Sequence, residues 1–161
     1  MAHGDFALIH VWAALVALPS GLAVVLLRKG GALHRCIGLV YVFAMLALNL
    51  AALAIYHLTG HFDLFHGFAT LSLIFTLLGL TMPIFRPSNW RLRHARWMSW
   101  SVLSLLGAAL NEAAIRLPLH VDRPARIIGV GMAIAMAITV AGFWLYPRLS
   151  RAVSRLNAVS G

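Results

Sequence analysis

Hydrophobic residues in this chain gather into five long runs, which polar residues, glycine and proline separate. The runs cover about residues 6–27, 36–58, 66–85, 97–117 and 127–146. A helix of about 20 apolar residues crosses the hydrocarbon core of a bilayer. Helices also pair nearly all of their backbone groups internally, which lipid requires. The pattern therefore predicts an all-α fold, a polytopic bundle of about five transmembrane helices in a single domain, residues 1–161.

The composition agrees with a membrane protein and argues against a water-soluble one. Of the 161 residues, 61% are hydrophobic and 11% are charged, whereas a soluble domain has about half and about a quarter. The formal net charge of +9 does not indicate nucleic acid as a partner, because the basic residues lie between apolar runs and form no separate domain. The expected partner is the lipid bilayer. The common hydrolase and nucleotide-binding motifs do not occur in the sequence, so we assign no enzyme class.

Basic residues are distributed unevenly between the two ends of the runs. Ten fall on one side and three on the other, while all four acidic residues fall towards the second side. Cytoplasmic loops carry the excess of Lys and Arg. We therefore expect a multi-pass protein of the cell (inner) membrane, with its N-terminus outside and its C-terminus in the cytoplasm. The cytoplasmic set is Arg28, Lys29, Arg35, Arg86, Arg91, Arg93, Arg96, Arg148, Arg151 and Arg155, and the outer set is Arg116, Arg123 and Arg126.

Polar residues inside the first four runs fall on one face of each predicted helix. Ionisable residues in a membrane are costly and usually face the interior of a bundle. We therefore expect a four-helix core, with the fifth helix packed outside it and the single cysteine, Cys36, buried as a structural thiol. At 100° per residue, the four stripes comprise His10, Ala13, Ala14, Ala17, Ser20 and Gly21; His34, Gly38, Tyr41, Met45, Asn49, Ala52 and Tyr56; His66 and Thr70; and His94, Met98, Ser101, Leu105, Ala108 and Glu112.

The stripes end in two polar clusters at opposite faces of the membrane. Glu112 and Arg116 lie four residues apart on one helix face, where they can form an ion pair. The outer cluster either lines a binding site or locks the helices together. The inner cluster either binds a ligand or contacts lipid headgroups. The outer cluster comprises His10, Asn49, His66, Asn111, Glu112 and Arg116, and the inner cluster comprises Lys29, His34, Arg35, Arg93, His94 and Arg96.

Histidines occur in pairs on alternate runs, with His10 and His66 at the outer level and His34 and His94 at the inner level. Two histidines on facing helices hold a b-type haem in a membrane protein, so the spacing is similar to that of two-haem b-type cytochromes. From His10 to the inner end of the first run is about 17 residues, or ~25 Å. An inner haem would therefore lie at the headgroup boundary. A single outer haem, or a transition-metal ion on His10, His66 and Glu112, avoids this problem.

Two other functions stay open beside a haem-binding electron-transfer subunit. One is a metal-binding or proton-coupled transporter, in which His10, His66, Asn49 and Glu112 line a site near the middle of the membrane. The inverted repeat and broken helices that many transporters have are not evident in the sequence. The other is a non-catalytic accessory subunit of a larger membrane complex, or a homo-oligomer, in which the polar groups serve packing.

A set of residues spread along the chain resembles a known family. The set runs through His10, Gly21, Arg28-Lys29-Gly30, His34-Arg35, Gly38, Tyr41 and Met45, then Phe65-His66, Leu71-Ser72-Leu73 and Gly79, and then His94-Ala95-Arg96-Trp97-Met98. It resembles the predicted bacterial membrane proteins catalogued as domain of unknown function 2306, over about residues 8–117. The resemblance implies a small polytopic membrane protein and no established activity, and the fifth run lies outside it. The resemblance also marks as a set His10, Lys29, His34, Arg35, His66, His94, Trp97 and Met98.

Overall fold

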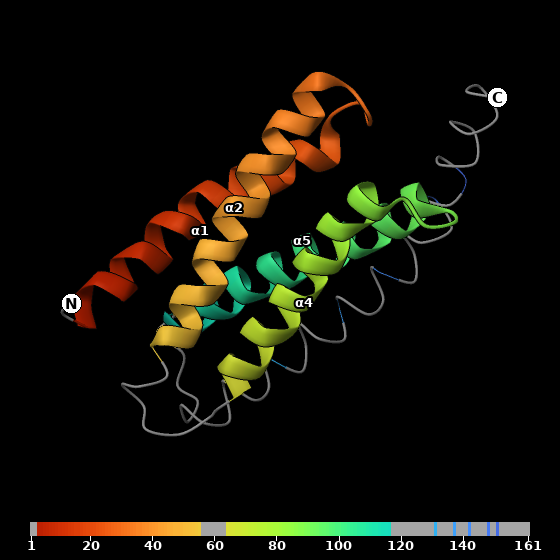
Figure 1. Ribbon diagram of the computed structural model, residues 1–161. Coiled ribbons are helices and arrows are strands. Elements are labelled where there is room, and N and C mark those ends of the chain that lie inside the picture. The colour runs from red at the N-terminus through yellow and green to blue at the C-terminus, as the bar shows by residue number, and fades with distance from the viewer. Residues whose placement is uncertain are drawn as a thin grey trace.

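The described part of the protein consists of four long helices (Figure 1). The computed structural model describes residues 3–55 and 64–116, together with Gly131, Ala137, Gly142, Arg148 and Arg151. In chain order the helices are α1 (His3–Leu26), α2 (Ala32–Ala54), α4 (Leu64–Phe85) and α5 (Trp90–Arg116). They form two antiparallel hairpins, α1–α2 and α4–α5, which pack against each other. Every regular element in these two ranges is a helix, which confirms the predicted all-α class.

The described helices support fewer membrane spans than the sequence predicted. Those that are long and apolar enough to cross a membrane are Asp5–Leu26, Ala32–Ala54 and His66–Phe85. Helix α5 has 27 residues and is about 40 Å long at 1.5 Å per residue, but the basic residues of its first two turns make it less apolar. Within 3–55 and 64–116 there are thus three candidate spans and one further long helix, and five spans are not supported. The predicted fifth run, 127–146, lies outside the described residues except for three single positions.

All four described helices begin earlier than the apolar runs indicated, and the difference is largest for α2 and α5. Helix α2 starts at Ala32 rather than at residue 36, and α5 starts at Trp90 rather than at residue 97. Hydropathy assigns basic segments to loops. However, long basic side chains extend a helix into the headgroup layer at little cost, because their charged ends reach water. His34 and His94 therefore belong to the first two turns of regular helices.

The α1–α2 turn reverses the chain through a glycine and a lysine. Gly30 has a φ of 84°, in the left-handed region that glycine adopts without strain. The Nζ atom of Lys29 donates to the carbonyls of Val24, at 2.8 Å, and Val25, at 2.5 Å. These carbonyls lie at the end of α1, where the helix offers no backbone donor. Partial burial along the helix end lowers the pKa of the Lys29 ammonium group.

Buried residues on α1 and α2 confirm the middle of the predicted stripes, while Tyr56, at the end of the second stripe, lies outside the described residues. Tyr41, Met45 and Asn49 on α2 are at most 1% exposed. On α1, Ala17 is fully buried, and Gly21 lies against the Tyr41 ring. A Cβ atom at Gly21 would be 2.8 Å from Cε2 of Tyr41. Small residues thus let the two helices approach closely, as is common in membrane proteins.

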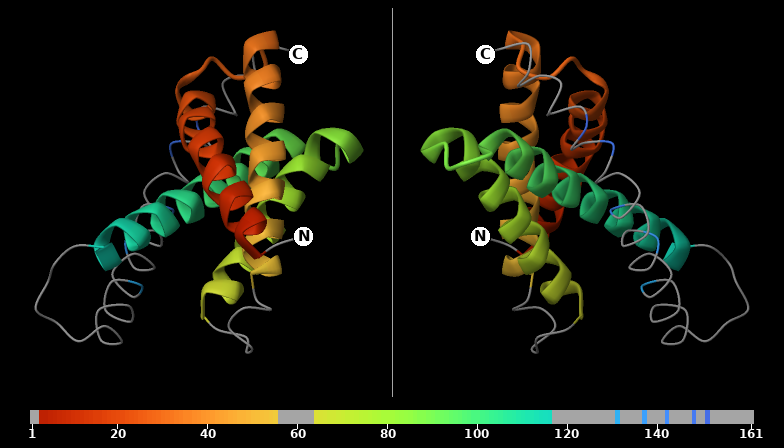
Figure 2. Two further views of the ribbon diagram at one scale, coloured as in Figure 1. Left: turned by 90° about the vertical axis from the view of Figure 1, so that its left-hand side faces the viewer. Right: turned by 90° about the vertical axis from the view of Figure 1, so that its right-hand side faces the viewer.

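The stripe on α5 is confirmed over only part of its length. Met98, Ser101 and Leu105 are buried, but Ala108 and Glu112, which we expected to face inward, are exposed. The reason is the path of α5, which crosses the other helices at an angle and diverges from them towards its C-terminal end (Figure 2). A stripe continued along the helix axis therefore leaves the core.

Aromatic side chains of α4 and α5 contact one another, and one of them also contacts a glycine from later in the chain. The Phe75 ring stacks on Trp97, with centroids 5.9 Å apart, and lies 6.0 Å from the Trp100 ring. Gly142, a described position in the predicted fifth run, lies against Trp100, where a Cβ atom would be 2.6 Å from Cη2. Residue 142 therefore packs against α5.

Large apolar side chains are exposed on the surface of the described helices. Trp12 is 66% exposed, Phe43 is 68% exposed and Phe85 is 77% exposed, which suits contact with lipid. Cys36 is exposed as well, so the expectation of a buried thiol was wrong. Cys36 follows His34 by two residues, about 200° round the helix, and therefore lies away from the stripe that packs on the core.

Candidate functional site

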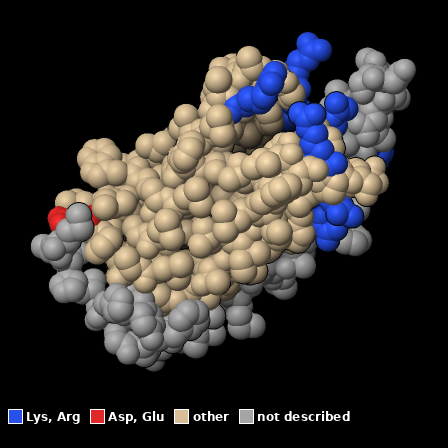
Figure 3. Space-filling model, in the orientation of Figure 1, with Lys and Arg blue, Asp and Glu red and all other residues tan. Residues whose placement is uncertain are grey.

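The two ends of the molecule carry opposite charge. Lys and Arg side chains gather at the end where the α1–α2 and α4–α5 turns lie, and acidic atoms are visible at the other end (Figure 3). This end with the two turns is called the basic end below, and its opposite the acidic end. The separation agrees with the distribution of charge along the sequence. Which end faces the cytoplasm stays a prediction.

At the basic end, the ring of His94 is fixed by the neighbouring helix. Its Nδ1 atom lies 2.8 Å from the carbonyl oxygen of Gly79 on α4. A carbonyl only accepts, so Nδ1 carries the proton and Nε2 keeps a lone pair. Gly79 also packs tightly on Met98, because a Cβ atom there would overlap the Met98 sulfur. His94 is therefore held in one tautomer by a closely packed α4–α5 contact.

His34 lies on α2 beside this group. It is close enough to Lys29 and His94 for their charges to act on its ring. Its Nδ1 atom is buried and has no hydrogen-bond partner among the described residues. The structure thus brings together three members of the predicted inner cluster, Lys29, His34 and His94. Its other members, Arg35, Arg93 and Arg96, have exposed side chains.

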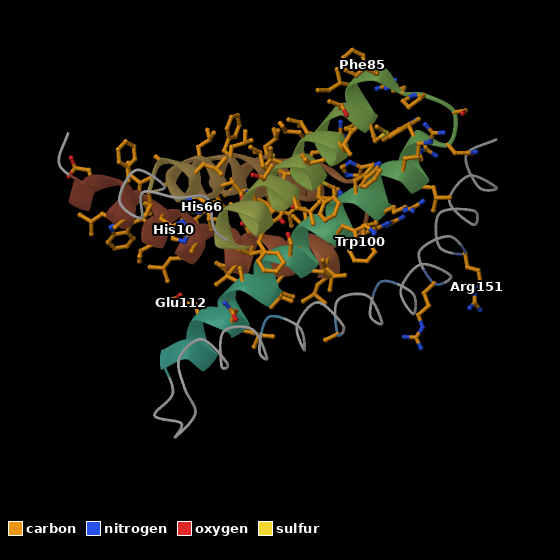
Figure 4. All side chains as sticks on the ribbon, turned by 90° about the horizontal axis from the view of Figure 1, so that it is seen from below. His10, His66, Phe85, Trp100, Glu112 and Arg151 are labelled. Carbon is orange, nitrogen blue, oxygen red and sulfur yellow. The ribbon has the colours of Figure 1, made fainter. Side chains whose placement is uncertain are left out.

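At the acidic end, His10 and His66 are both oriented towards the bundle. The Nδ1 atom of His10 lies 3.2 Å from the Leu48 carbonyl of α2, so this ring too carries its proton on Nδ1. His66 is 5% exposed. In Figure 4 both residues lie towards the end of the bundle opposite to Phe85, and Glu112 lies on the same side.

Other members of the predicted outer cluster are spread over this end. Asn49 donates from Nδ2 to the Met45 carbonyl at 2.8 Å, and Oδ1 of Asn111 is buried without a partner in the described part of the chain. The Arg116 side chain lies outside the described residues, so its pairing with Glu112 stays a prediction. No three His, Cys, Asp or Glu side chains within 3–55 and 64–116 are grouped closely enough to hold a metal ion. His10, His66 and Glu112 thus form no three-ligand site in this structure.

A network of hydrogen-bonded hydroxyl groups lies in the middle of the bundle, and the sequence did not predict that these groups contact one another. The Ser101 hydroxyl lies 2.8 Å from the Tyr41 hydroxyl and 2.7 Å from that of Thr76. Ser104 donates to Ser72 at 3.1 Å. Tyr41, Thr76 and Ser101 are fully buried. The available signal was spacing, since hydroxyl residues recur at 72 and 76 and again at 101 and 104, each pair on one helix face.

Comparison with known proteins assigns the chain to a family. The family model described as "Predicted membrane protein (DUF2306)" matches residues 7–145. The chain belongs to this family. The match reaches beyond residue 117 and includes most of the fifth run, which the sequence resemblance had left outside because its recognisable motifs end at Met98. No curated protein and no solved structure matches the chain.

Proposed function

We propose that this member of the family binds a b-type haem in the membrane and serves as an electron-transfer subunit. The observation that supports the proposal most is the His94 ring, whose Nδ1 atom is bound to the Gly79 carbonyl at 2.8 Å. Metal-ligating histidines nearly always donate their second ring N–H to a carbonyl or carboxylate, which leaves the other nitrogen for the metal. Haem bound there would supply one-electron transfer.

The surroundings of His94 fit such a group. His34 stands beside it on another helix and has a buried ring nitrogen without a partner among the described residues. Gly38 follows His34 by four residues on the same face, and a Cβ atom at Gly38 would meet no heavy atom within 4 Å. No described atom therefore crowds the face of α2 at Gly38, one turn from His34. These contacts favour His34 and His94 as the ligands of a single haem, although the pair lies at the headgroup level, and His10 and His66 are the alternative pair.

An absorption spectrum tests the haem proposal. The full chain is purified in mild detergent after expression with ample haem, and spectra are recorded before and after reduction. A Soret band and a sharp reduced α-band are expected. His34→Ala and His94→Ala should each abolish the band, while His10→Ala and His66→Ala, the matched variants at the acidic end, should leave it. If only the His10→Ala and His66→Ala variants lose the Soret band, the haem binds at the acidic end. A colourless wild-type protein would exclude the function.

A second candidate is proton-coupled transport, which one observation favours. Hydrogen-bonding side chains occupy the interior at several depths, from Asn49 through the Tyr41–Ser101–Thr76 network, and a polar interior is what a transport path needs. Glu112 is exposed, so it is a weaker candidate than the sequence indicated. Liposomes containing the protein should then acidify when a pH gradient is imposed, and Asn49→Leu should stop the flux. Unchanged flux in that variant would remove this candidate.

We also propose that the basic end faces the cytoplasm of a cell membrane, with the N-terminus outside and the C-terminus inside. The support is the positive-inside rule applied to the charged ends in Figure 3. A reporter enzyme fused after Gly161 that is active only in the cytoplasm should be active. Activity of a periplasmic reporter at the same position would reverse the orientation. Assembly with other subunits or with further copies stays a prediction.

A further inference from the structure

Helix α4 contains a proline near its C-terminal end. Pro83 lies inside the helix, which ends at Phe85. A proline has no backbone N–H, so the carbonyl four residues earlier loses its helical donor, and in a straight helix the proline ring would also clash with that carbonyl. In α4 this carbonyl belongs to Gly79. Helical bonding continues after the proline, because the N–H of Arg86 donates to the Met82 carbonyl at 2.9 Å. Pro83 therefore removes the helical donor of one carbonyl only.

The carbonyl of Gly79 has found its donor on another helix. Gly79 is buried, and a buried carbonyl without a partner is costly, above all in a membrane. In membrane helices, neighbouring helices commonly pair the backbone groups that a proline frees. Here the donor is the ring of His94 on α5, whose Nδ1 atom lies 2.8 Å from the Gly79 oxygen. The acceptor that orients His94 is thus the atom that Pro83 deprives of its helical donor.

The small size of residue 79 brings α5 within reach of this oxygen. A Cβ atom at Gly79 would overlap the sulfur of Met98 and lie 3.3 Å from the Met98 backbone nitrogen. Met98 follows His94 by four residues, on the same face of α5. Gly79 thus allows the close approach of the two helices, and Pro83 leaves the carbonyl available at the point of contact.

A backbone N–H at residue 83 would compete with His94. A carbonyl oxygen has two lone pairs and accepts two donors at most, and a helical donor would align it with the axis of α4. The tautomer of a histidine is set by the hydrogen bonds of its two ring nitrogens. A weaker bond from Nδ1 would therefore allow the proton to move to Nε2. With proline at residue 83, the His94 ring meets no competition from the helix.

We propose that Pro83 is a positioning residue for His94. It frees the Gly79 carbonyl, which holds the His94 ring in the Nδ1–H tautomer and leaves Nε2 available to a ligand. The tautomer is fixed with or without a cofactor, and only the use of Nε2 as a haem ligand rests on the proposed function.

Nitrogen NMR of the full chain in detergent, without added haem, tests the role of Pro83. Histidine is isotopically labelled, the pH is set where the rings are neutral, and the His94 signals are assigned by their loss in His94→Gln. The wild type should show the proton on Nδ1 and none on Nε2. In Pro83→Ala an N–H returns to residue 83, and the Nε2–H form should become populated. An unchanged tautomer in Pro83→Ala would overturn the proposal, as would a wild-type ring protonated on Nε2.

Two further variants separate the missing N–H from a general change in the shape of α4. The α-hydroxy analogue of alanine at position 83 forms a backbone ester, which lacks both the N–H and the proline ring. We expect it to keep the wild-type tautomer. Pro19→Ala removes the proline inside α1 and should also leave the tautomer unchanged. If the ester variant behaves like Pro83→Ala, or if Pro19→Ala alters the His94 ring equally, the missing N–H is not the cause and the proposal fails.

Absorption spectra distinguish a failure of this proposal from a failure of the haem proposal. If haem binds at His94, Pro83→Ala should retain less of it than Pro19→Ala does at the same haem concentration. A haem-containing wild type with an unchanged tautomer in Pro83→Ala would support the haem site and overturn the role of Pro83. A colourless wild type whose tautomer changes in Pro83→Ala would support the role of Pro83 and exclude the haem.

Discussion

The two helical hairpins are held together by different interactions between their helices. In the α1–α2 hairpin, small residues such as Ala17 and Gly21 bring the helices into close contact. In the α4–α5 hairpin, side-chain hydrogen bonds such as Thr76–Ser101 and Ser72–Ser104 join the helices. Lipid is as apolar as the side chains, so the hydrophobic effect does not draw helices together inside a membrane. Close packing and interhelical hydrogen bonds are the attractive interactions that the protein itself supplies, and each hairpin relies mainly on one of them.

Tyr41 belongs to both arrangements. Its ring packs on Gly21 of α1, and its hydroxyl lies 2.8 Å from that of Ser101 on α5. The ring is fully buried and fixed at both ends. A change on either side of Tyr41 therefore tests how the two hairpins are connected.

The largest effect is expected at Gly21. In Gly21→Ala the new Cβ atom would lie 2.8 Å from Cε2 of Tyr41. The ring cannot move away without breaking the hydrogen bond between its hydroxyl and that of Ser101. We expect unfolding in detergent to become easier by about 2 kcal/mol, as for overpacked cores. The control is Gly67→Ala, where a Cβ atom meets nothing within 4 Å and stability should be unchanged or slightly higher. Equal effects of the two variants would contradict close packing at Gly21.

A smaller effect is expected from breaking the hydroxyl network. Ser101→Ala removes the partner of Tyr41 and one partner of Thr76. We expect a loss of about 1.5 kcal/mol, because a buried hydroxyl is left unpaired. Adding Tyr41→Phe should recover part of this loss, as a double-mutant cycle would measure. Ser20→Ala is the control, since that hydroxyl bonds only to carbonyls of its own helix. Strict additivity of the two substitutions would argue against the bond.

The smallest effect is expected at Gly79, although its contact looks as tight. A Cβ atom there would overlap the sulfur of Met98. The Met98 side chain is flexible and can adopt another rotamer, unlike the Tyr41 ring, so that the main remaining contact would be the Met98 backbone nitrogen at 3.3 Å. We expect Gly79→Ala to lower the free energy of unfolding by about 1 kcal/mol, measured beside Gly21→Ala. A larger loss than that of Gly21→Ala would show that the α4–α5 hairpin is the more tightly packed one.

The sequence predicted the helices and buried faces better than the partners of individual side chains. Tyr41, Met45 and Asn49 recur with the helical period, so their burial follows from local spacing. Thr76 lies in a run that is apolar almost throughout, and its partner Ser101 is 25 residues away. Such a pair depends on how two helices cross, which no local pattern records. The same crossing takes Ala108 and Glu112 out of the core.

In the candidate site too, the sequence predicted which helix faces carry the residues but not the partners of their side chains. The sequence predicted that His34 and His94 continue the polar stripes of their helices, but it set the helix starts at residues 36 and 97, because the basic residues there lower the hydropathy. The carbonyl that orients His94 belongs to Gly79, fifteen residues earlier on another helix. A backbone acceptor leaves no mark of its partner in a sequence, so the tautomer of this ring could come only from the structure.

The exposed thiol of Cys36 has a practical consequence. The chain contains one cysteine, and this residue is exposed near the basic end. Cys36 lies in the second turn of α2, next to the end of this candidate span, so a small thiol reagent that cannot pass a bilayer would label each molecule at a single known atom, and from one compartment only. The fraction of protein labelled in sealed vesicles would then measure how many molecules point each way. Mild oxidation would likewise give a covalent dimer only if two copies meet through this part of α2.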